Sequence, residues 1–422
     1  MSASSDTREI DEHLFRRESA RMVAALTRVF GVHNLALAED VVQDALCRAL
    51  EVWKVRGVPD NPAAWLMSTA KNRAIDILRR ERTARTFAPE LGRLLETEWT
   101  LAPLLDEAFS PNTIRDEQLR MMFSCCHPRL PEAAQLALIL NILCGFGTNE
   151  IASALLTGQA AIEKRISRGK STLASTKTLF DLKDAEFEPR LETVRRALYL
   201  LFNEGYHGAS SASPVRAELC SEAVRLTMLL REHAPAATPT TNALAALMCL
   251  HAGRLPARLD SAGELSAFMD QDRSLWDVKL VAEGLDLLER SAAGVEVSEY
   301  HIEAAIAAVH ACARSIEETD WREIISLYDR LMKVAPSPVI ALNRAIAIGQ
   351  LEGPARGVKE LQAIHDVERF ANYPFYPAAL GEFELRRGHF DDALKHFQSA
   401  LSLARSDVER RFLQKRVQRC TA

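Results

Sequence analysis

The chain has 422 residues, 48% of them hydrophobic, and a formal net charge of −5, which is enough apolar material for two to four well-buried domains. No stretch approaches the roughly twenty apolar residues of a membrane span, and no convincing alternating strand pattern occurs, so the sequence predicts an all-α protein with no membrane partner. The polar N-terminal segment lacks the apolar part of a secretory signal and the cysteines are dispersed in apolar patterns, so we expect a cytoplasmic protein.

The first clear element is a helix over residues 38–53. Its apolar residues recur at helical spacing, and its other face carries the carboxylates Glu39, Asp40, Asp44 and Glu51 against a single arginine. An acidic face of this kind suits a basic partner surface, to which it would give orientation and fast association. The alternative is an ordinary solvated helix face.

A loop with one glycine and two prolines leads to a basic helix. Asn61 is placed to cap this helix, and Pro62 occupies its first position. Residues 63–85 contain six Lys and Arg against two Asp and Glu, although the whole chain is acidic. Such a concentration of positive charge indicates a surface that faces phosphates. Trp65 lies on the apolar stripe, so we interpret it as a core residue in preference to a wedge that melts DNA.

Cys125, Cys126 and His127 are adjacent near the end of another predicted helix. Adjacent cysteines are poorly spaced for tetrahedral zinc, and no second pair of ligands follows. We therefore expect a helix that stops before Pro128, and neither a metal nor another cofactor in this protein.

Residues 148–173 predict two helices joined by a tight turn at residues 155–158. Apolar residues on both helices have the spacing of a helix-turn-helix, whose second helix enters the major groove. A packing hairpin with a solvated basic face is the alternative. Residues 159–177 contain five Lys and Arg against one Glu, which favours DNA binding.

The rest of the chain, from about residue 188, predicts helices only. Residues 321–353 and 376–404 have the pattern of tetratricopeptide helix pairs, in which small residues let paired helices approach closely. Residues 191–290 show no clear period. One polar group in this part is either a ligand cluster or a set of helix-end contacts around a packed tryptophan: Asp272, Arg273, Trp276 and Asp277.

In this order and spacing, AEDVVQDALCRALEVW, NPAAWLMSTAKNRAIDILRRERT and GFGTNEIASALLTGQAAIEKRISRGKSTL resemble three parts of an extracytoplasmic-function sigma factor of the sigma-70 family. They are similar to its polymerase-binding helix, its −10 recognition helix and its −35 helix-turn-helix. The segments FSCCHP, LYLLFNEGYH, QDRSLWD and APSPVIALNRAIA resemble the subgroup with a long C-terminal tetratricopeptide-like extension. The −10 pattern is carried by Trp65, Leu66, Ala70, Asn72, Ala74, Asp76, Arg79 and Arg80.

The resemblance implies four segments. Residues 10–86 correspond to sigma region 2, residues 87–114 to a linker, residues 115–180 to sigma region 4, and residues 188–422 to the helical extension. Two positions depart from the family pattern. Glu163 occupies a place where a basic residue is frequent, and the −10 loop has no aromatic ring to stack on an extruded base.

The resemblance also implies site residues. Contacts with the −10 element, including an unstacked base at the loop, are expected from Lys54, Arg56, Asp60, Asn61, Asn72, Arg73, Arg79, Arg80 and Arg82. For the loop, simple turn chemistry is an equal alternative. Contacts with the −35 element are expected from Thr148, Gln159, Lys164, Arg165, Arg168 and Lys170. Contacts with polymerase are expected from Glu39, Asp40, Asp44 and Glu51.

The implied function is promoter-specific transcription initiation. The partners would be RNA polymerase core enzyme, promoter DNA and a protein or peptide that acts on the regulatory extension. The alternative is a DNA-binding regulator with a tetratricopeptide sensor that never binds polymerase as a sigma factor. The sequence contains no P-loop, no HExxH motif and no convincing catalytic triad, so we expect no enzyme.

Overall fold

The computed structural model describes residues 3–82, 103, 105–155, 157–176, 178–183, 185–207, 216–260, 264–365, 370–371, 373–404 and 407–421. Within these ranges every regular element is a helix, and the only other pairing is an isolated antiparallel bridge between Leu259 and Leu265. The predicted all-α fold class is therefore confirmed for the described residues. None of the helices in these ranges is long and apolar enough to cross a membrane.

The chain forms two compact units. Unit 1 comprises residues 1–153 and 157–197, and unit 2 comprises residues 154–156 and 198–422. The boundary at residues 197 and 198 falls inside helix α10. The segments predicted as separate domains, 10–86 and 115–180, lie together in unit 1.

The helices up to this boundary are, in chain order, α1 (Ala3–Phe30), η1 (Val32–Asn34), α2 (Leu35–Arg56), α3 (Pro62–Arg82), α6 (Pro111–Cys125), α7 (Glu132–Leu138), η2 (Ile139–Leu143), α8 (Thr148–Ala154), α9 (Gln159–Ser175) and α10 (Phe187–His207). The helix predicted over residues 38–53 is observed as α2, and α3 and α8 begin at Pro62 and Thr148, as the sequence predicts.

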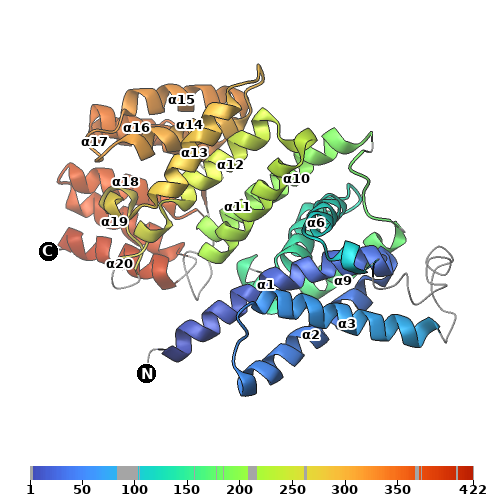
Figure 1. Ribbon diagram of the computed structural model, residues 1–422. Coiled ribbons are helices and arrows are strands. Elements are labelled where there is room, and N and C mark those ends of the chain that lie inside the picture. The colour runs from blue at the N-terminus through green and yellow to red at the C-terminus, as the bar shows by residue number, and fades with distance from the viewer. Residues whose placement is uncertain are drawn as a thin grey trace. The chain divides into compact units, whose positions relative to one another are not determined.

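Helix α1 is the central element of unit 1. It packs against α2 and α3 on one side, and against α6 and η2 on the other (Figure 1). Helix α9 packs against α7 and also reaches η1, at the start of α2. Met22, Ala25 and Leu26 of α1 are completely buried, which is expected of a helix covered from two sides. The two predicted DNA-binding segments therefore share one core.

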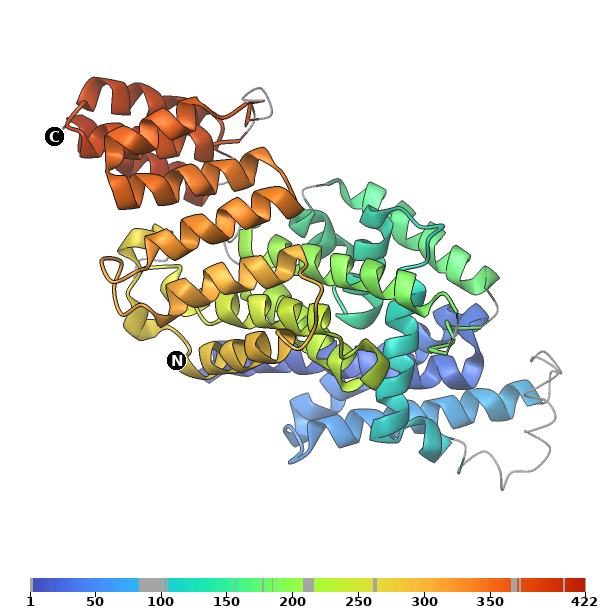
Figure 2. The same ribbon diagram turned by 90° about the horizontal axis from the view of Figure 1, so that it is seen from above.

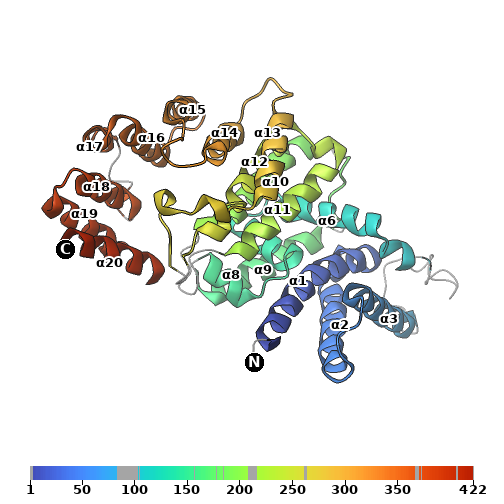
Figure 3. The ribbon, with the colours of Figure 1, turned by 60° about the vertical axis from the view of Figure 1, so that its left-hand side comes forward.

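The helices of unit 2 after α10 are α11 (Ala217–Glu232), η3 (Ala234–Ala236), α12 (Pro239–Ala252), η4 (Leu255–Ala257), η5 (Phe268–Asp270), η6 (Arg273–Leu275), α13 (Val278–Ser291), α14 (Glu299–Cys312), α15 (Trp321–Val334), α16 (Pro338–Glu352), α17 (Pro354–Gln362), α18 (Phe375–Arg386), α19 (Phe390–Ser402) and α20 (Asp407–Thr421). From α14 onward each helix packs against the next, so the core runs along the stack (Figure 2). These later helices follow one another around an arc (Figure 3).

The two helix pairs predicted from the tetratricopeptide pattern are present as α15 with α16 and α18 with α19. Close approach in the second pair depends on a glycine, because a Cβ atom at Gly381 would lie 3.0 Å from the Phe397 ring. A turn at Gly388, with φ of 78°, joins the two helices as predicted. The tetratricopeptide assignment itself stays a prediction.

Candidate nucleic-acid and polymerase-binding site

The acidic face of α2 is present on the outside of unit 1. Asp40, Asp44 and Glu51 are exposed, while Glu39 is half-buried. The buried stripe on the other side consists of Val41, Val42, Ala45, Ala49 and Trp53, as the periodicity predicts. Leu50 also belongs to the apolar residues at helical spacing, but it is 58% exposed beside Glu51. The outer face of α2 is therefore acidic with an apolar residue in it.

Three of the four carboxylates form ion pairs. Glu39 accepts two hydrogen bonds from Lys170 of α9, at 2.6 and 2.8 Å. Asp44 pairs with Arg73 of α3 at 2.8 Å, and Glu51 pairs with Arg48 on its own helix at 3.2 Å. Asp40 forms no ion pair with any described residue. The structure thus joins predicted polymerase contacts to predicted DNA contacts, which the sequence did not indicate.

The loop between α2 and α3 positions Asn61 as the cap of α3. The Asn61 side-chain oxygen accepts a hydrogen bond from the backbone amide of Ala64 at 3.0 Å, and Pro62 is the first helical residue. Gly57 ends α2 with φ of 81°, a conformation that favours glycine. Lys54, Arg56 and Asp60 are exposed around the loop. The predicted cap is confirmed, and the cations Lys54 and Arg56 are exposed to solvent near it.

Substitution of Asn61 separates capping from DNA contact. Asn61→Ala is expected to lower the free energy of unfolding by about 1 kcal/mol, because the cap oxygen is lost, whereas Asn61→Ser keeps a cap and changes it by only a few tenths. Thermal unfolding of both variants measures this difference. Promoter opening by Asn61→Ser then tests the side-chain amide alone. Reduced opening with unchanged stability supports a contact between the amide and a base. Opening at the wild-type level means that Asn61 serves only as a cap.

The basic face of α3 is partly paired and partly exposed. Asn72 and Arg79 are exposed, whereas Arg73 is held by Asp44. The side chains of Arg80 and Arg82 lie outside the described residues. Trp65 is half-buried, with its ring 5.5 Å from that of Trp53 in an edge arrangement. This contact agrees with the interpretation of Trp65 as a packing residue.

Helices α8 and α9 have the bounds predicted for the two helices of a helix-turn-helix. Ile151, Ile162, Ile166 and Leu173 are buried, as the apolar spacing predicts. On the outer side of α9, Lys164 and Arg168 are exposed, Arg165 is half-buried and Lys170 is held by Glu39.

At the start of α9, the Gln159 amide donates to Glu163 at 2.8 Å and to Thr148 at 3.5 Å. Glu163, where the sequence departs from the family pattern, therefore accepts a hydrogen bond from Gln159, a residue predicted to contact the −35 element.

Further contacts hold the two predicted DNA-binding segments together, and sequence reasoning missed all of them. Arg16 of α1 pairs with Glu150 of α8 at 2.5 Å and lies 4.7 Å over the Phe146 ring. A Cβ atom at Gly145 would lie only 3.0 Å from the backbone oxygen of Arg16, so the two backbones are in close contact.

Arg28, at the other end of α1, pairs with Glu107 and Glu117 at 3.2 Å each. The residues joined are 79 and 89 positions apart, beyond any local pattern.

The Cys125–His127 segment ends a helix, as predicted. Helix α6 ends at Cys125, and Cys126 is its C-terminal cap. Both thiols are buried; burial raises the pKa of Cys125 well above its ordinary value and that of Cys126 to about 12.

The group from Asp272 to Asp277 resolves largely into helix-end contacts. Asp272 caps η6 and Asp277 caps α13 through backbone amides, and Trp276 is only 7% exposed. Arg273 donates to the carbonyl oxygens of His310 and Ala313. The two aspartates are therefore explained by local structure, while Arg273 points toward other helices of unit 2.

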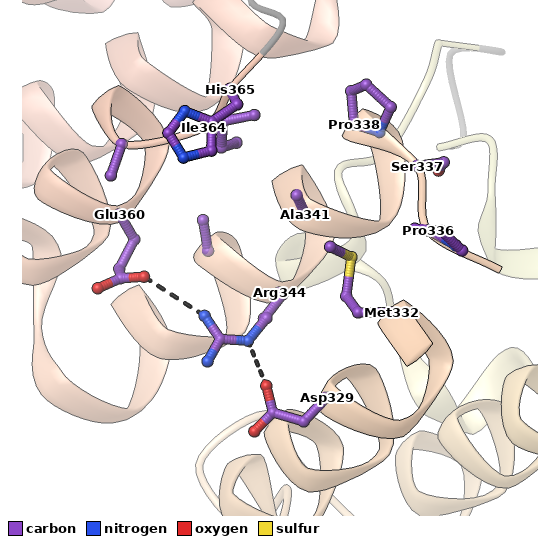
Figure 4. Close-up of a pocket in the computed structure, with 12 residues that line it drawn as sticks. Asp329, Met332, Pro336, Ser337, Pro338, Ala341, Arg344, Glu360, Ile364 and His365 are labelled. Carbon is purple, nitrogen blue, oxygen red and sulfur yellow. Dashed lines mark hydrogen bonds and ion pairs between the residues drawn. The ribbon is translucent and has the colours of Figure 1, made fainter. Parts of the chain in front are cut away.

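Unit 2 also contains a pocket of about 460 Å³ between α15, α16 and α17 (Figure 4). Arg344 crosses its floor, paired with Asp329 at 2.5 Å and with Glu360 at 3.4 Å. The remaining lining is mostly apolar and comes largely from the segment APSPVIALNRAIA and its neighbours: Met332, Pro336, Pro338, Ala341, Ala345, Ala363 and Ile364.

Comparison with known proteins matches two separate parts of the chain to two families. Residues 14–84 match the family model of sigma-70 region 2, and residues 190–292 match a family of unknown function, DUF6596. The first match covers α2 and α3, and it indicates a sigma-factor role in transcription initiation. The second match covers the first part of the extension. Because the function of that family is unknown, the match assigns no function to this part.

One full-length relative is the uncharacterized protein R00370 of Rhizobium meliloti (strain 1021). It is 38% identical over 411 residues, which cover 97% of this chain and 95% of the relative. The chain therefore belongs to the same family as this rhizobial protein.

Proposed function

We propose that this protein is an extracytoplasmic-function sigma factor with a regulatory C-terminal extension. One observation carries the proposal: residues 14–84, which match sigma-70 region 2, form an acidic helix and a basic helix packed side by side. Carboxylates beside the exposed Leu50 on α2 suit a basic polymerase surface with an apolar spot. Exposed cations on α3 and α9 suit the phosphates and base edges of the −10 and −35 elements.

The packing of unit 1 corresponds, in this proposal, to a closed form. Elements centred at −10 and −35 are about 25 base pairs apart, or about 85 Å along B-DNA. Helices α3 and α9 are about 32 and 26 Å long. Glu39 and Asp44 lie only about 8 Å apart along α2 and pair with Lys170 of α9 and Arg73 of α3, so these two cations lie much closer together than about 85 Å.

Both elements are therefore reached together only after α9 and its neighbours leave α1 and α2. A chain of about 22 residues, the length that separates the two segments, can span at most about 75 Å when fully extended, which is enough for opening without rearrangement of the helices themselves.

The deciding experiment is transcription with purified components. The protein with core polymerase should give specific transcripts from a library of genomic fragments, and core polymerase alone should not. The competing function, a DNA-binding regulator that does not act as a sigma factor, predicts specific DNA binding without core-dependent initiation. A folded protein that gives no transcript from any fragment would overturn the proposal.

For the extension we propose a protein or peptide partner. The pocket of Figure 4 supports this, because its Arg344 charge is already shared by two carboxylates while most of its lining is apolar. Such a pocket suits an apolar side chain of a peptide, held between stacked helices as in other helical repeats.

Removal of the extension is expected to change promoter activity several-fold. The region beyond residue 198 folds as its own compact unit, so a protein ending after α10 should keep unit 1 intact. Transcription by the full-length and shortened proteins, compared at equal concentrations and with circular dichroism as the folding control, measures the effect. Identical activity under all conditions tried would leave the extension without a regulatory role.

A further inference from the structure

Three arginines of the extension lie among aromatic rings and have no carboxylate partner among the described residues. The Arg254 guanidinium is 4.3 Å from the Phe268 ring centre and 5.3 Å from that of Trp276. Arg273 stands over the same two rings, and Arg258 lies 4.2 Å over Tyr206. None of the three forms an ion pair with any residue that the structure describes. This arginine cluster, Arg254, Arg258 and Arg273, is separate from the predicted DNA and polymerase surfaces.

The cluster is buried deeply enough for its charge to matter. Arg254 is only 8% exposed, and burial, together with the neighbouring charges of Arg258 and Arg273, lowers its pKa. His310 lies beside the Phe268 ring at 4.7 Å. Burial and the charges of Arg254 and Arg273 lower its pKa to about 3, so it is neutral and adds no charge. A buried cation without a counterion is costly, and stacking on rings offsets only part of that cost.

The nearby carboxylates are occupied elsewhere. Glu264 pairs with Arg411 and Lys415 of α20, and Asp270 pairs with Arg416 of the same helix at 2.9 Å. Asp272 and Asp277 are used as helix caps. Glu317, which is exposed, acts on Arg273 but not on Arg254.

Several buried donors of the cluster also lack an acceptor. The Nε atoms of Arg254 and Arg258 and the indole Nε1 of Trp276 are enclosed and have no hydrogen-bond partner among the described residues. Arg254 uses one terminal nitrogen, which donates to the Gln271 amide oxygen at 3.4 Å. Buried donors of native proteins are nearly always paired, so a group of them marks a place for an acceptor that the described residues do not supply.

We propose that the arginine cluster is a binding site for a small phosphate-bearing anion, with Arg254 and Arg258 as its principal ligands. Guanidinium groups match the geometry of phosphate oxygens, and a doubly charged anion balances the cluster better than a single carboxylate does. Arg273, which is held by backbone carbonyls, supplies charge from a fixed position. The proposal does not depend on the sigma-factor function.

The site is tested with the full-length protein and inorganic phosphate. In a buffer whose ionic strength is matched with chloride, low millimolar phosphate should raise the unfolding temperature by a few degrees, because a ligand that binds only the folded state stabilises it. Calorimetric titration with phosphate, pyrophosphate and a mononucleotide measures the affinity for each and shows whether the anion is free or part of a larger molecule.

Two variants make the test specific. Arg258→Gln, at a half-buried position, should weaken phosphate binding at least tenfold. Arg254→Met should abolish the response to phosphate yet unfold at the same or a higher temperature without it, because an unpaired buried charge is replaced by an apolar chain of similar size. Arg290→Gln, an exposed arginine of α13 paired with Asp286, is the control and should respond as wild type does.

General stabilisation by phosphate would act on all of these proteins alike. Equal responses in wild type, Arg258→Gln and Arg254→Met, or no response beyond that to chloride, would overturn the proposal. If Arg254→Met fails to fold, Arg258→Gln alone decides.

Discussion

Replacement of both Arg79 and Arg80 by alanine is expected to reduce formation of the open promoter complex by about tenfold for each arginine, the usual effect of losing a hydrogen bond to a charged group. Arg79 lies on the exposed side of α3, and Arg73, six residues earlier, pairs with Asp44. Two lost phosphate contacts release about two fewer counterions, so the slope of log affinity against log salt should become shallower by roughly two.

The matched control removes the same charge from the extension. Arg290 and Arg356 are exposed arginines that pair with Asp286 and Glu360 on their own helices, and the double alanine variant should leave both opening and the salt slope unchanged. Footprints and salt titrations on one promoter compare the two double variants. If both behave as wild type does, the basic face of α3 is solvated surface and takes no part in DNA binding.

Local helix structure followed readily from the sequence. Capping and breaking residues such as Asn61, Gly57 and Gly388 set the ends of helices, because their effects act over a few neighbours. The apolar period gave the buried sides of α2, α3 and α9. Leu50 of α2, which is exposed, is a residue at the margin of the stripe, where a small rotation of the helix decides between burial and exposure.

The arrangement of the predicted site did not follow from the sequence. The acidic and basic faces appeared separate because they are far apart along the chain, whereas the ion pairs Glu39–Lys170 and Arg16–Glu150 join residues 131 and 134 positions apart. The pattern of charged residues predicts the sign of a surface's charge but not which partner that surface contacts. The arginine cluster was missed for a similar reason, since only Arg273 of its members stood out in sequence, beside aspartates that turned out to be caps.

In the extension too, the sequence predicted local helix pairs but not contacts between segments far apart in the chain. Small residues predicted two helix pairs, and the helices of both are present. The contact of α20 with the segment before η6, through Glu264 and Asp270, depends on the course of the whole stack. No spacing within either segment could have indicated it.

Reversal of charge at Arg28 is expected to open unit 1. Arg28 pairs with Glu107 and Glu117 at 3.2 Å each, and Arg28→Glu would place three carboxylates together between α1 and the α6 region. Exposed ion pairs contribute little by themselves. Repulsion near the buried Glu117, however, should cost about 2 kcal/mol, or roughly thirtyfold in the equilibrium between closed and open forms. None of these residues belongs to the predicted DNA or polymerase contacts.

If only the open form binds core polymerase, apparent affinity rises with its population, so Arg28→Glu should bind up to about thirtyfold more tightly. Hydrogen exchange should speed up at α1 and α6 while circular dichroism stays unchanged. Restoring an opposite charge with Glu107→Arg in the Arg28→Glu background should reverse part of both effects, as coupled neighbours do, and Arg290→Glu in the extension should have neither. Wild-type affinity and exchange in a folded Arg28→Glu protein would show that the packing of α1 against α6 does not limit access to polymerase.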